Sequence, residues 1–241
     1  MMFALHSSAT PPESIDSASA CVLHTPCAVP YPLPLTLLEG KLYLNKPLFV
    51  RSLTYADALK AHELVQSLTL SEQGSVEEGF LLGLEHAPDL ERLFSEGMGF
   101  GIFDETGTLL AFIAGCWSET EWFQGKISFD GWKRPRQQVH QALPELPELF
   151  FYIDKIAAVR GLRRTGMSKY LYTLIIQQLP QDTPLVAFIV ERPWYNAPSV
   201  GFHEALGFLQ IGSLERPPSL QLPAHHLGVF LKFCQASSSG S

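Results

Sequence analysis

Two segments in the second half of the chain combine residue types that could hold a phosphate-bearing cofactor. The first, residues 163–168, interrupts an apolar strand pattern and precedes a helical one. Backbone N–H groups in such a turn, together with the positive end of the helix dipole, can converge on a diphosphate. The second, residues 196–208, predicts a short helix that Gly207 ends in a left-handed conformation. Together they suggest the two sides of a cofactor cleft.

Other common ligand motifs do not fit this chain. There is no Gly-Lys-Ser/Thr for a P-loop, and Gly97-x-Gly99-x-Gly101 leads into a strand where a dinucleotide fingerprint requires a helix. His225-His226 has no Asp, Cys or third His at ligand spacing, so we expect no metal site.

The elements that must position the two segments follow from hydrophobic periodicity and turn residues. Before the first segment we expect a strand at 48–50 and a helix through Val65 with Thr54 and Asp57 at its start. A second helix over 76–94, broken around Pro88, precedes a hairpin of 99–103 and 109–116. Residues 117–146 read as a loop rich in aromatic and basic residues.

The second half of the chain reads as alternating strands and helices. The expected elements are a strand at 149–158, a helix from Met167 that Pro180 ends, a strand at 185–190, a helix at 199–206, and strands at 208–211 and 229–233. Mixed strands around one β-α-β crossover indicate an α/β fold with a sheet of mixed direction.

Composition sets the class of protein and its compartment. The 241 residues are 46% hydrophobic and carry a formal charge of −7, which predicts a soluble globular protein and argues against a nucleic-acid partner. The four cysteines show no C-x-x-C spacing, which favours a reduced compartment. We find no apolar run long enough to span a membrane and no secretory signal, so we expect a cytoplasmic protein.

The two ends of the chain differ from its middle. Residues 1–40 are rich in Ser and Pro without periodicity, which predicts a largely disordered or strap-like extension. Residues 41–235 form the expected folded domain, and 236–241 a polar tail.

The two segments resemble the motifs of the GCN5-related N-acetyltransferase (GNAT) superfamily. The first superfamily motif, Gln/Arg-x-x-Gly-x-Gly/Ala, is matched with Ser168 as a departure, and Arg164 stands where many members have Gly, which implies a stiffer turn. The second is approximately Asn-x-x-(Ala/Ser)-x-x-Phe-Tyr-x-x-x-Gly-Phe, with His203 in place of Tyr. A closer resemblance over residues 48–234 is to bacterial predicted acetyltransferases of unassigned substrate. The matched positions are Arg163, Gly166, Ser168, Asn196, Ser199, Phe202, Gly207 and Phe208.

The resemblance implies a fold and an activity. The fold is a mixed, mostly antiparallel sheet with splayed central parallel strands flanked by helices. The activity is transfer of acetyl from acetyl-CoA to a primary amine of a small molecule or peptide, by direct attack within a ternary complex. The alternative is a catalytically weak CoA-binding sensor or interaction module. A homodimer through the C-terminal strands is expected by analogy.

The resemblance also implies site residues. The catalytic Glu of histone-type relatives falls on Tyr152, so Asp154, which strand alternation places on the face of Tyr152, Ile156 and Ala158, becomes the first candidate base. Glu191 is the second candidate base, and His203 is the candidate acid. Trp117, Trp122, Phe123 and Trp132 are expected to shape the acceptor pocket, and Lys133, Arg134 and Arg136 to contact the cofactor's 3′-phosphate, an anionic acceptor or solvent. The candidate cofactor-binding residues are Ile156, Ala157, Ala158, Arg163, Arg164, Thr165, Gly166, Met167, Ser168, Asn196, Ser199 and Phe202.

Overall fold

The computed structural model describes residues 48–69, 79–82, 86–129, 145–218 and 222–234. The expected N-terminal extension over residues 1–40, the polar tail over 236–241, Trp132 and the basic run of 133–136 lie outside the described residues.

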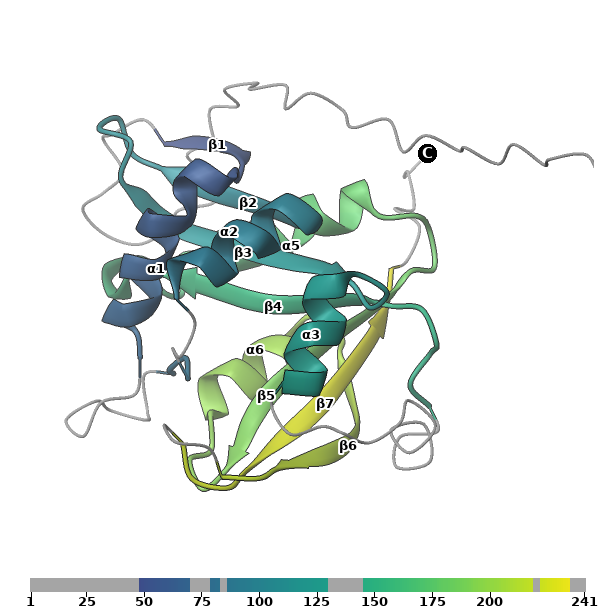
Figure 1. Ribbon diagram of the computed structural model, residues 1–241. Helices are drawn as coiled ribbons and strands as arrows, with labels where there is room; N and C mark the ends of the chain where they lie inside the picture. The colour runs from purple at the N-terminus through teal and green to yellow at the C-terminus, as the bar shows by residue number, and fades with distance from the viewer. Residues whose placement is uncertain (1–47, 70–78, 83–85, 130–144, 219–221, 235–241) are drawn as a thin grey trace, which may run out of the picture.

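Seven strands form one mixed sheet in the order β1-β2-β3-β4-β5-β7-β6 (Figure 1). All neighbouring pairs are antiparallel except β4 and β5, which are parallel. The strands are β1 (Phe49–Ser52), β2 (Met98–Phe103), β3 (Leu109–Trp117), β4 (Phe151–Ala158), β5 (Pro184–Arg192), β6 (Leu209–Arg216) and β7 (His225–Phe233).

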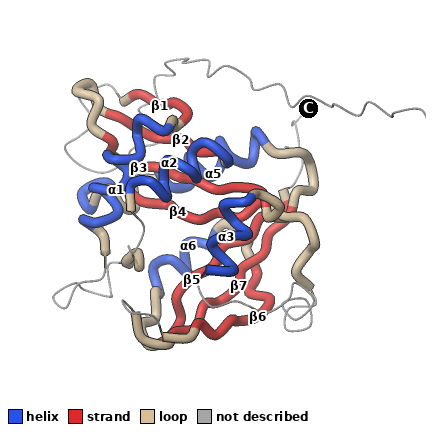
Figure 2. Tube along the Cα trace, viewed as in Figure 1, coloured by secondary structure: helices blue, strands red, loops and turns tan. Residues whose placement is uncertain are grey.

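Helices cover both faces of the sheet (Figures 1 and 2). Apolar residues of α1 (Ala58–Ser67), α2 (Ala87–Glu96) and α3 (Glu121–Phe129) join one buried cluster, here called the front cluster. Residues of α5 (Met167–Gln178) and α6 (Ala197–Ala205) join a second, the rear cluster, on the opposite face. Short 3-10 turns, η2 (Tyr55–Asp57) and η4 (Arg160–Leu162), precede α1 and α5.

The start of α1 confirms the N-terminal signal in the sequence. The Asp57 carboxylate accepts the Thr54 backbone N–H at 3.0 Å, as in a capping box, and also binds the Arg51 guanidinium at 2.6 Å. Burial tends to raise the pKa of Asp57, but the hydrogen bonds from Arg51 and Thr54 outweigh it and hold the pKa below its ordinary value. The prediction of a helix beginning at this position is therefore confirmed.

Two helical assignments were wrong. The second helix, expected over 76–94, is α2 (Ala87–Glu96), and the described residues 79–82 within the expected range are not helical. Pro88 lies in the first turn of α2, where a missing N–H costs nothing. Residues 117–146 are not all loop, because Glu121–Phe129 forms α3, which Thr120 begins by accepting the Phe123 N–H at 3.3 Å. Strands β6 and β7 also extend further than the apolar runs that suggested them.

No helix within the described ranges has the length and apolar character needed to cross a bilayer. Those ranges also contain no group of three or more His, Cys, Asp or Glu side chains positioned to hold a metal ion.

Candidate functional site

The parallel strands β4 and β5 separate soon after they begin. Their register pairs Phe151 with Leu185 and ends at Ile153 with Ala187, although β4 continues to Ala158 and β5 to Arg192. Figure 1 shows the two strands diverging toward their carboxyl ends. Within the described residues, the β4 segment from Ile156 to Ala158 therefore has no ladder pairing with β5, and its backbone groups on that edge can bind a ligand.

A bulge in β4 accompanies this divergence. Opposite β3, Ala114 pairs with Lys155 and Gly115 pairs with Ile153, so Asp154 is the extra residue. The bulge reverses the alternation of side chains, because Tyr152 packs in the front cluster whereas Ile156 and Ala158 pack in the rear one. The expectation that Tyr152, Asp154, Ile156 and Ala158 share one face is therefore wrong.

The turn before α5 has the conformation that an anion site needs. Gly166 is the N-cap of α5 with φ +88°, and Arg164 also has a positive φ of 64°. The backbone of Arg164 therefore lies in the left-handed region, which is strained for a residue with a side chain. Glycine, which many members of the resembled superfamily have at this position, tolerates that region. In the described part of the chain, no backbone N–H from Arg164 to Lys169 donates to a protein acceptor. These amides, at the positive end of α5, are free to hold phosphate oxygens.

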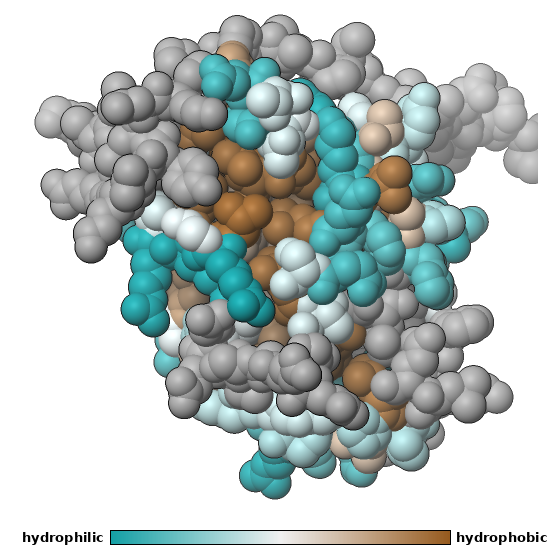
Figure 3. Space-filling view, turned by 90° about the vertical axis from the view of Figure 1, so that its left-hand side faces the viewer, coloured by the Kyte–Doolittle hydropathy of each residue, from teal (hydrophilic) through white to brown (hydrophobic). Residues whose placement is uncertain are grey.

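A cavity of about 1880 Å³ joins the turn to the diverging strands. It exceeds the roughly 300–1,000 Å³ of ordinary small-molecule pockets, so an extended cofactor and an acceptor can both fit. Seen from the side toward which β4 and β5 diverge, apolar surface gathers at the centre with hydrophilic residues beside it (Figure 3). The predicted cofactor residues that line the cavity are Ile156, Ala158, Arg163, Arg164, Gly166, Met167, Ser168, Asn196, Ser199 and Phe202.

Two predicted cofactor residues stay outside the described lining. Ala157 is buried in the front cluster opposite Phe112 of β3. The Thr165 hydroxyl donates to the Leu162 carbonyl at 2.6 Å, which shapes the turn from within.

Asn196 is the N-cap of α6 and also hydrogen-bonds to a segment that is distant in the sequence. Its side-chain oxygen accepts the Ser199 N–H at 3.4 Å, and its Nδ2 donates to the Phe80 carbonyl at 2.9 Å. The adjacent Gly79 carbonyl accepts from Arg163 Nη1 at 3.4 Å. The segment 79–82 thus lies against both motif segments, an arrangement that the sequence did not predict.

His203 is buried with both ring nitrogens hydrogen-bonded. Nδ1 lies 2.8 Å from the Ser199 carbonyl and Nε2 lies 2.7 Å from the Tyr172 hydroxyl. Because a carbonyl can only accept, Nδ1 carries the proton and Nε2 accepts from Tyr172. Burial lowers the pKa of His203 to about 4, against the weaker opposing effect of the Ser199 carbonyl. Near neutral pH the imidazole therefore holds α6 against α5 and has no second proton to donate.

The two predicted carboxylates lie in different places. Asp154 lines the cavity, and its side chain, 1% exposed, lies 3.0 Å from Lys155 Nζ. Glu191 is the extra residue of a β5 bulge, accepts from Gln210 Nε2 at 2.8 Å, and lies outside the described cavity lining. The structure thus does not bring Glu191 together with Asp154.

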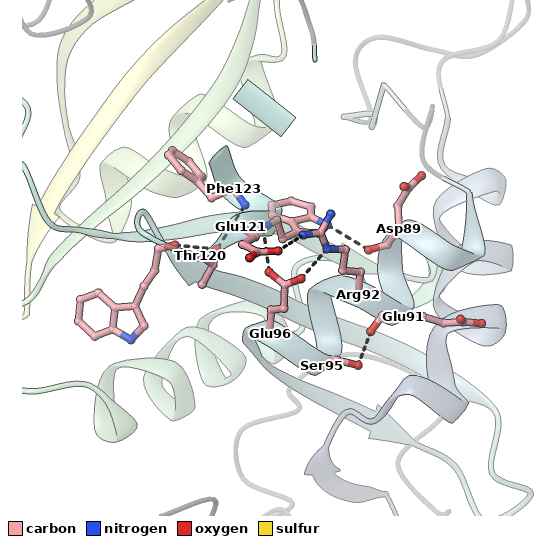
Figure 4. Close-up of polar contacts among 10 residues, drawn as sticks. Asp89, Glu91, Arg92, Ser95, Glu96, Thr120, Glu121 and Phe123 are labelled. Carbon is pink, nitrogen blue, oxygen red and sulfur yellow. Dashed lines mark hydrogen bonds and ion pairs between the residues drawn. The ribbon is translucent and has the colours of Figure 1, made fainter. Parts of the chain in front are cut away.

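The α3 helix supplies an aromatic wall to the cavity. Glu96 of α2 binds both Arg92 and the backbone N–H of Trp122, the latter at 2.7 Å (Figure 4). The Trp122 indole N–H donates to the Asp89 carbonyl at 3.1 Å, and the ring lines the cavity. Trp117 and Phe123 instead pack against Phe151 and against Phe150 and Tyr152, respectively.

Sequence reasoning assigned no role at this site to four residues that the structure places in it or beside it. Tyr172 belongs to no motif, because its hydrogen bond with His203 joins α5 to α6 and arises only when the two helices pack together. Arg216, Phe188 and Tyr152 line the cavity, whereas Tyr172 is outside the described lining. Arg216 is the last residue of β6, a strand that the sequence predicted to end at Ile211.

Comparison with solved structures identifies the fold. No protein-family model matches the chain, and no curated protein matches it in sequence. The crystal structure of Arabidopsis thaliana NAA60 in complex with acetyl-CoA has a TM-score of 0.52 at 12% identity, over 77% of this chain and 98% of that one. The ribosomal-protein-alanine N-acetyltransferase of Escherichia coli has a TM-score of 0.50 at 12% identity, over 80% and 98%. A Staphylococcus aureus N-acetyltransferase has a TM-score of 0.50 at 15% identity, over 78% and 97%.

The chain therefore has the fold of the GCN5-related N-acetyltransferases. The mixed sheet, the splayed parallel strands and the flanking helices expected from the two motifs are all confirmed.

Proposed function

We propose that this protein transfers acetyl from acetyl-CoA to a primary amine. The observation that carries the proposal is that β4 and β5 stop pairing at Ile153 while the free amides of the Arg164–Lys169 turn open onto the same cavity. That combination offers backbone donors and acceptors for an amide-containing arm and a cradle for its diphosphate. Similarity to a fold that has been crystallised with acetyl-CoA supports the choice of cofactor.

Different residues would bind the diphosphate and the pantetheine arm of the cofactor. The amides from Arg164 to Lys169 and the Ser168 hydroxyl would bind the diphosphate, with nearby guanidinium groups adding positive charge. The backbone of β4 at Ile156 and Ala158 would pair with the pantetheine amides. When bound, acetyl-CoA supplies a thioester whose acetyl carbon an amine can attack.

The chain's own groups must stabilise the developing oxyanion and remove the amine proton. We assign the oxyanion to a backbone N–H near the end of β4, around Ala157 or Ala158, where preorganised donors are worth most. We assign the proton to Asp154, which lines the cavity. Lys155 pairs with that carboxylate at 3.0 Å, and turnover is expected to rise with pH as free amine becomes available.

The state of His203 favours one alternative. Because His203 is neutral and engaged at both nitrogens, the departing thiolate has no donor from this side chain. A protein that binds acetyl-CoA without turnover, as a sensor or interaction module, is therefore the second candidate. We further propose a cytoplasmic location and, by analogy alone, a homodimer.

Calorimetry with acetyl-CoA followed by thiol release against an amine panel tests the proposal. We expect binding, amine-dependent release of free thiol, and roughly 3- to 10-fold weaker binding in Arg164→Gln, because one charge near a phosphate contributes about 1 kcal/mol. Arg192→Gln, an exposed cation outside the described lining, is the matched control and should bind normally. Binding without turnover from pH 6 to pH 10 would select the sensor, and no binding would reject both candidates.

A further inference from the structure

A third apolar cluster lies at the cavity, separate from the front and rear clusters and here called the third cluster. Its buried members are Phe80, Val190 and Leu227, and packed against them are Leu82, Phe188 and Trp194. Val190 of β5 pairs with Leu227 of β7 beyond the point where β4 stops pairing with β5. All of these residues except Trp194 belong to the described cavity lining. The third cluster therefore offers apolar surface to a ligand in the cavity.

Hydrogen bonds from two directions hold the segment 79–82, which supplies Phe80. The Phe80 carbonyl accepts from Asn196 Nδ2 at 2.9 Å, and the Leu81 backbone N–H donates to the Leu68 carbonyl at 3.2 Å. Asn196 is the N-cap of α6, whereas Leu68 is the C-cap of α1. Because helix ends support the segment on both sides, its apolar side chains form a preorganised wall, which lowers the entropic cost of binding a ligand against them.

Aromatic rings extend this apolar surface toward α3. The Phe188 ring packs against both the third and the front clusters, and its centroid lies 4.9 Å from that of the Tyr152 ring. Trp122 also lines the cavity, and its indole N–H donates to the Asp89 carbonyl, so its ring requires no polar partner from a ligand. Tyr152 and Trp122 belong to the front cluster, whereas α5 packs in the rear one. The aromatic surface thus lies across the sheet from the proposed diphosphate site.

The carboxylates of the lining favour an acceptor with one amine. Among the described residues of the lining they are Asp154 and Asp89. Asp154 is the extra residue of the β4 bulge, and Asp89 lies in the first turn of α2, where its carboxylate accepts the His86 backbone N–H at 2.9 Å. Neither belongs to the third cluster. A second ammonium group placed against that cluster would therefore lose hydration without gaining a carboxylate partner.

We propose that the acceptor is a small primary monoamine whose amine is attached to an apolar, ring-containing group. The ring lies against Phe188 and the third cluster, and the amine lies toward Asp154. This inference rests on the proposed acetyl transfer and specifies its substrate class. Burial of apolar surface supplies the binding free energy, and edge or offset contacts with the aromatic rings orient the acceptor.

Calorimetric titration with two matched pairs of amines tests this assignment. 2-Phenylethylamine and ethylamine differ by the ring, and 1,4-diaminobutane and butylamine differ by the second ammonium group. Each amine is titrated with and without saturating CoA. We expect 2-phenylethylamine to bind about 10-fold or more tighter than ethylamine, because its ring leaves water for an apolar wall. We expect 1,4-diaminobutane to bind no tighter than butylamine.

Variants assign the ring preference to this wall of the cavity. Phe188→Ala should reduce the preference for 2-phenylethylamine over ethylamine to about 3-fold or less. Phe188→Leu, which keeps most of the side-chain volume, should fall between the parent and Phe188→Ala. Phe100→Ala changes another half-buried strand phenylalanine, one outside the described lining, and should keep the whole preference.

Four results would overturn the inference: no amine of the series binds, ethylamine binds as tightly as 2-phenylethylamine, 1,4-diaminobutane binds tighter than butylamine, or both Phe188 variants keep the preference of the parent. CoA binding is measured for every variant, and if Phe188→Ala does not fold, Phe188→Leu decides. Failure of the parent to bind CoA counts against the proposed function instead, because the titrations without CoA measure the ring preference separately.

Discussion

Removing one hydroxyl group tests the structural role of His203. In Tyr172→Phe the ring stays while the O–H that donates to Nε2 at 2.7 Å is lost. Both residues are buried, with 1% and 3% of their surfaces exposed, so water cannot replace the donor without opening the core. A buried acceptor left without a partner costs about 1–3 kcal/mol. We expect the free energy of unfolding to fall by that amount.

Urea unfolding measures the loss, and Tyr195→Phe is the matched control. Tyr195 is 52% exposed, so its variant should unfold with the midpoint of the parent. The pH dependence of thiol release above pH 6 should not change in Tyr172→Phe, because an imidazole with a pKa of about 4 does not titrate there. Parental stability in Tyr172→Phe, or the loss of a titrating step between pH 6 and pH 9, would refute the structural role.

The same burial predicts how stability depends on pH. The pKa of His203 is about 4 in the folded protein and about 6.5 when unfolded, so between these values the unfolded state binds more protons. Its contribution is fully present above pH 6.5 and is lost as the pH falls to 4, by about 3 kcal/mol. In His203→Gln this part of the slope between pH 6.5 and pH 4 should disappear.

The remaining predictions concern two glycines that position the site. Gly166→Ala should lose about 1–2 kcal/mol of stability and weaken acetyl-CoA binding, because φ is +88° there; Gly201→Ala, whose added Cβ meets nothing within 4 Å, should gain about 0.5–1 kcal/mol, and equal urea midpoints for the two would contradict the left-handed requirement. Gly115→Ala should lose about 3 kcal/mol in thermal unfolding, because its Cβ would overlap the Tyr152 carbonyl beside the β4 bulge. A Gly115→Ala protein of parental stability would show that β4 can shift freely.

Local signals predicted the elements more reliably than their extent. The capping box at Thr54 and the break at Pro180 act within one helical turn, so the helix start and end they mark are confirmed. Helix α3 was not predicted from the sequence, because the backbone N–H of Trp122 in its first turn donates to Glu96, a residue distant in the sequence. Strand β6 extends beyond Ile211 because antiparallel pairing with β7 supports polar residues that periodicity does not mark.

The candidate site divides in the same way. The turn before α5 could be inferred because Gly166 and its neighbours act through their own backbone, and a backbone conformation is set by a few adjacent residues. Roles that depend on what a side chain meets could not be inferred. Asp154 and Glu191 were the first and second candidate bases from the sequence, and the structure places Asp154 in the cavity and Glu191 against Gln210.

By itself the sequence determined the order of the strands and of the described helices other than α3, the turn before α5 and the small residues around it. Only the tertiary structure decided where β4 and β5 stop pairing, which nitrogen of His203 carries its proton, and that Arg216 shares a cavity with the turn. The physical reason is the distance along the chain over which each feature is determined. Turn and cap geometry depend on neighbours along the chain, whereas burial, pairing and charge environment depend on residues that only folding brings together.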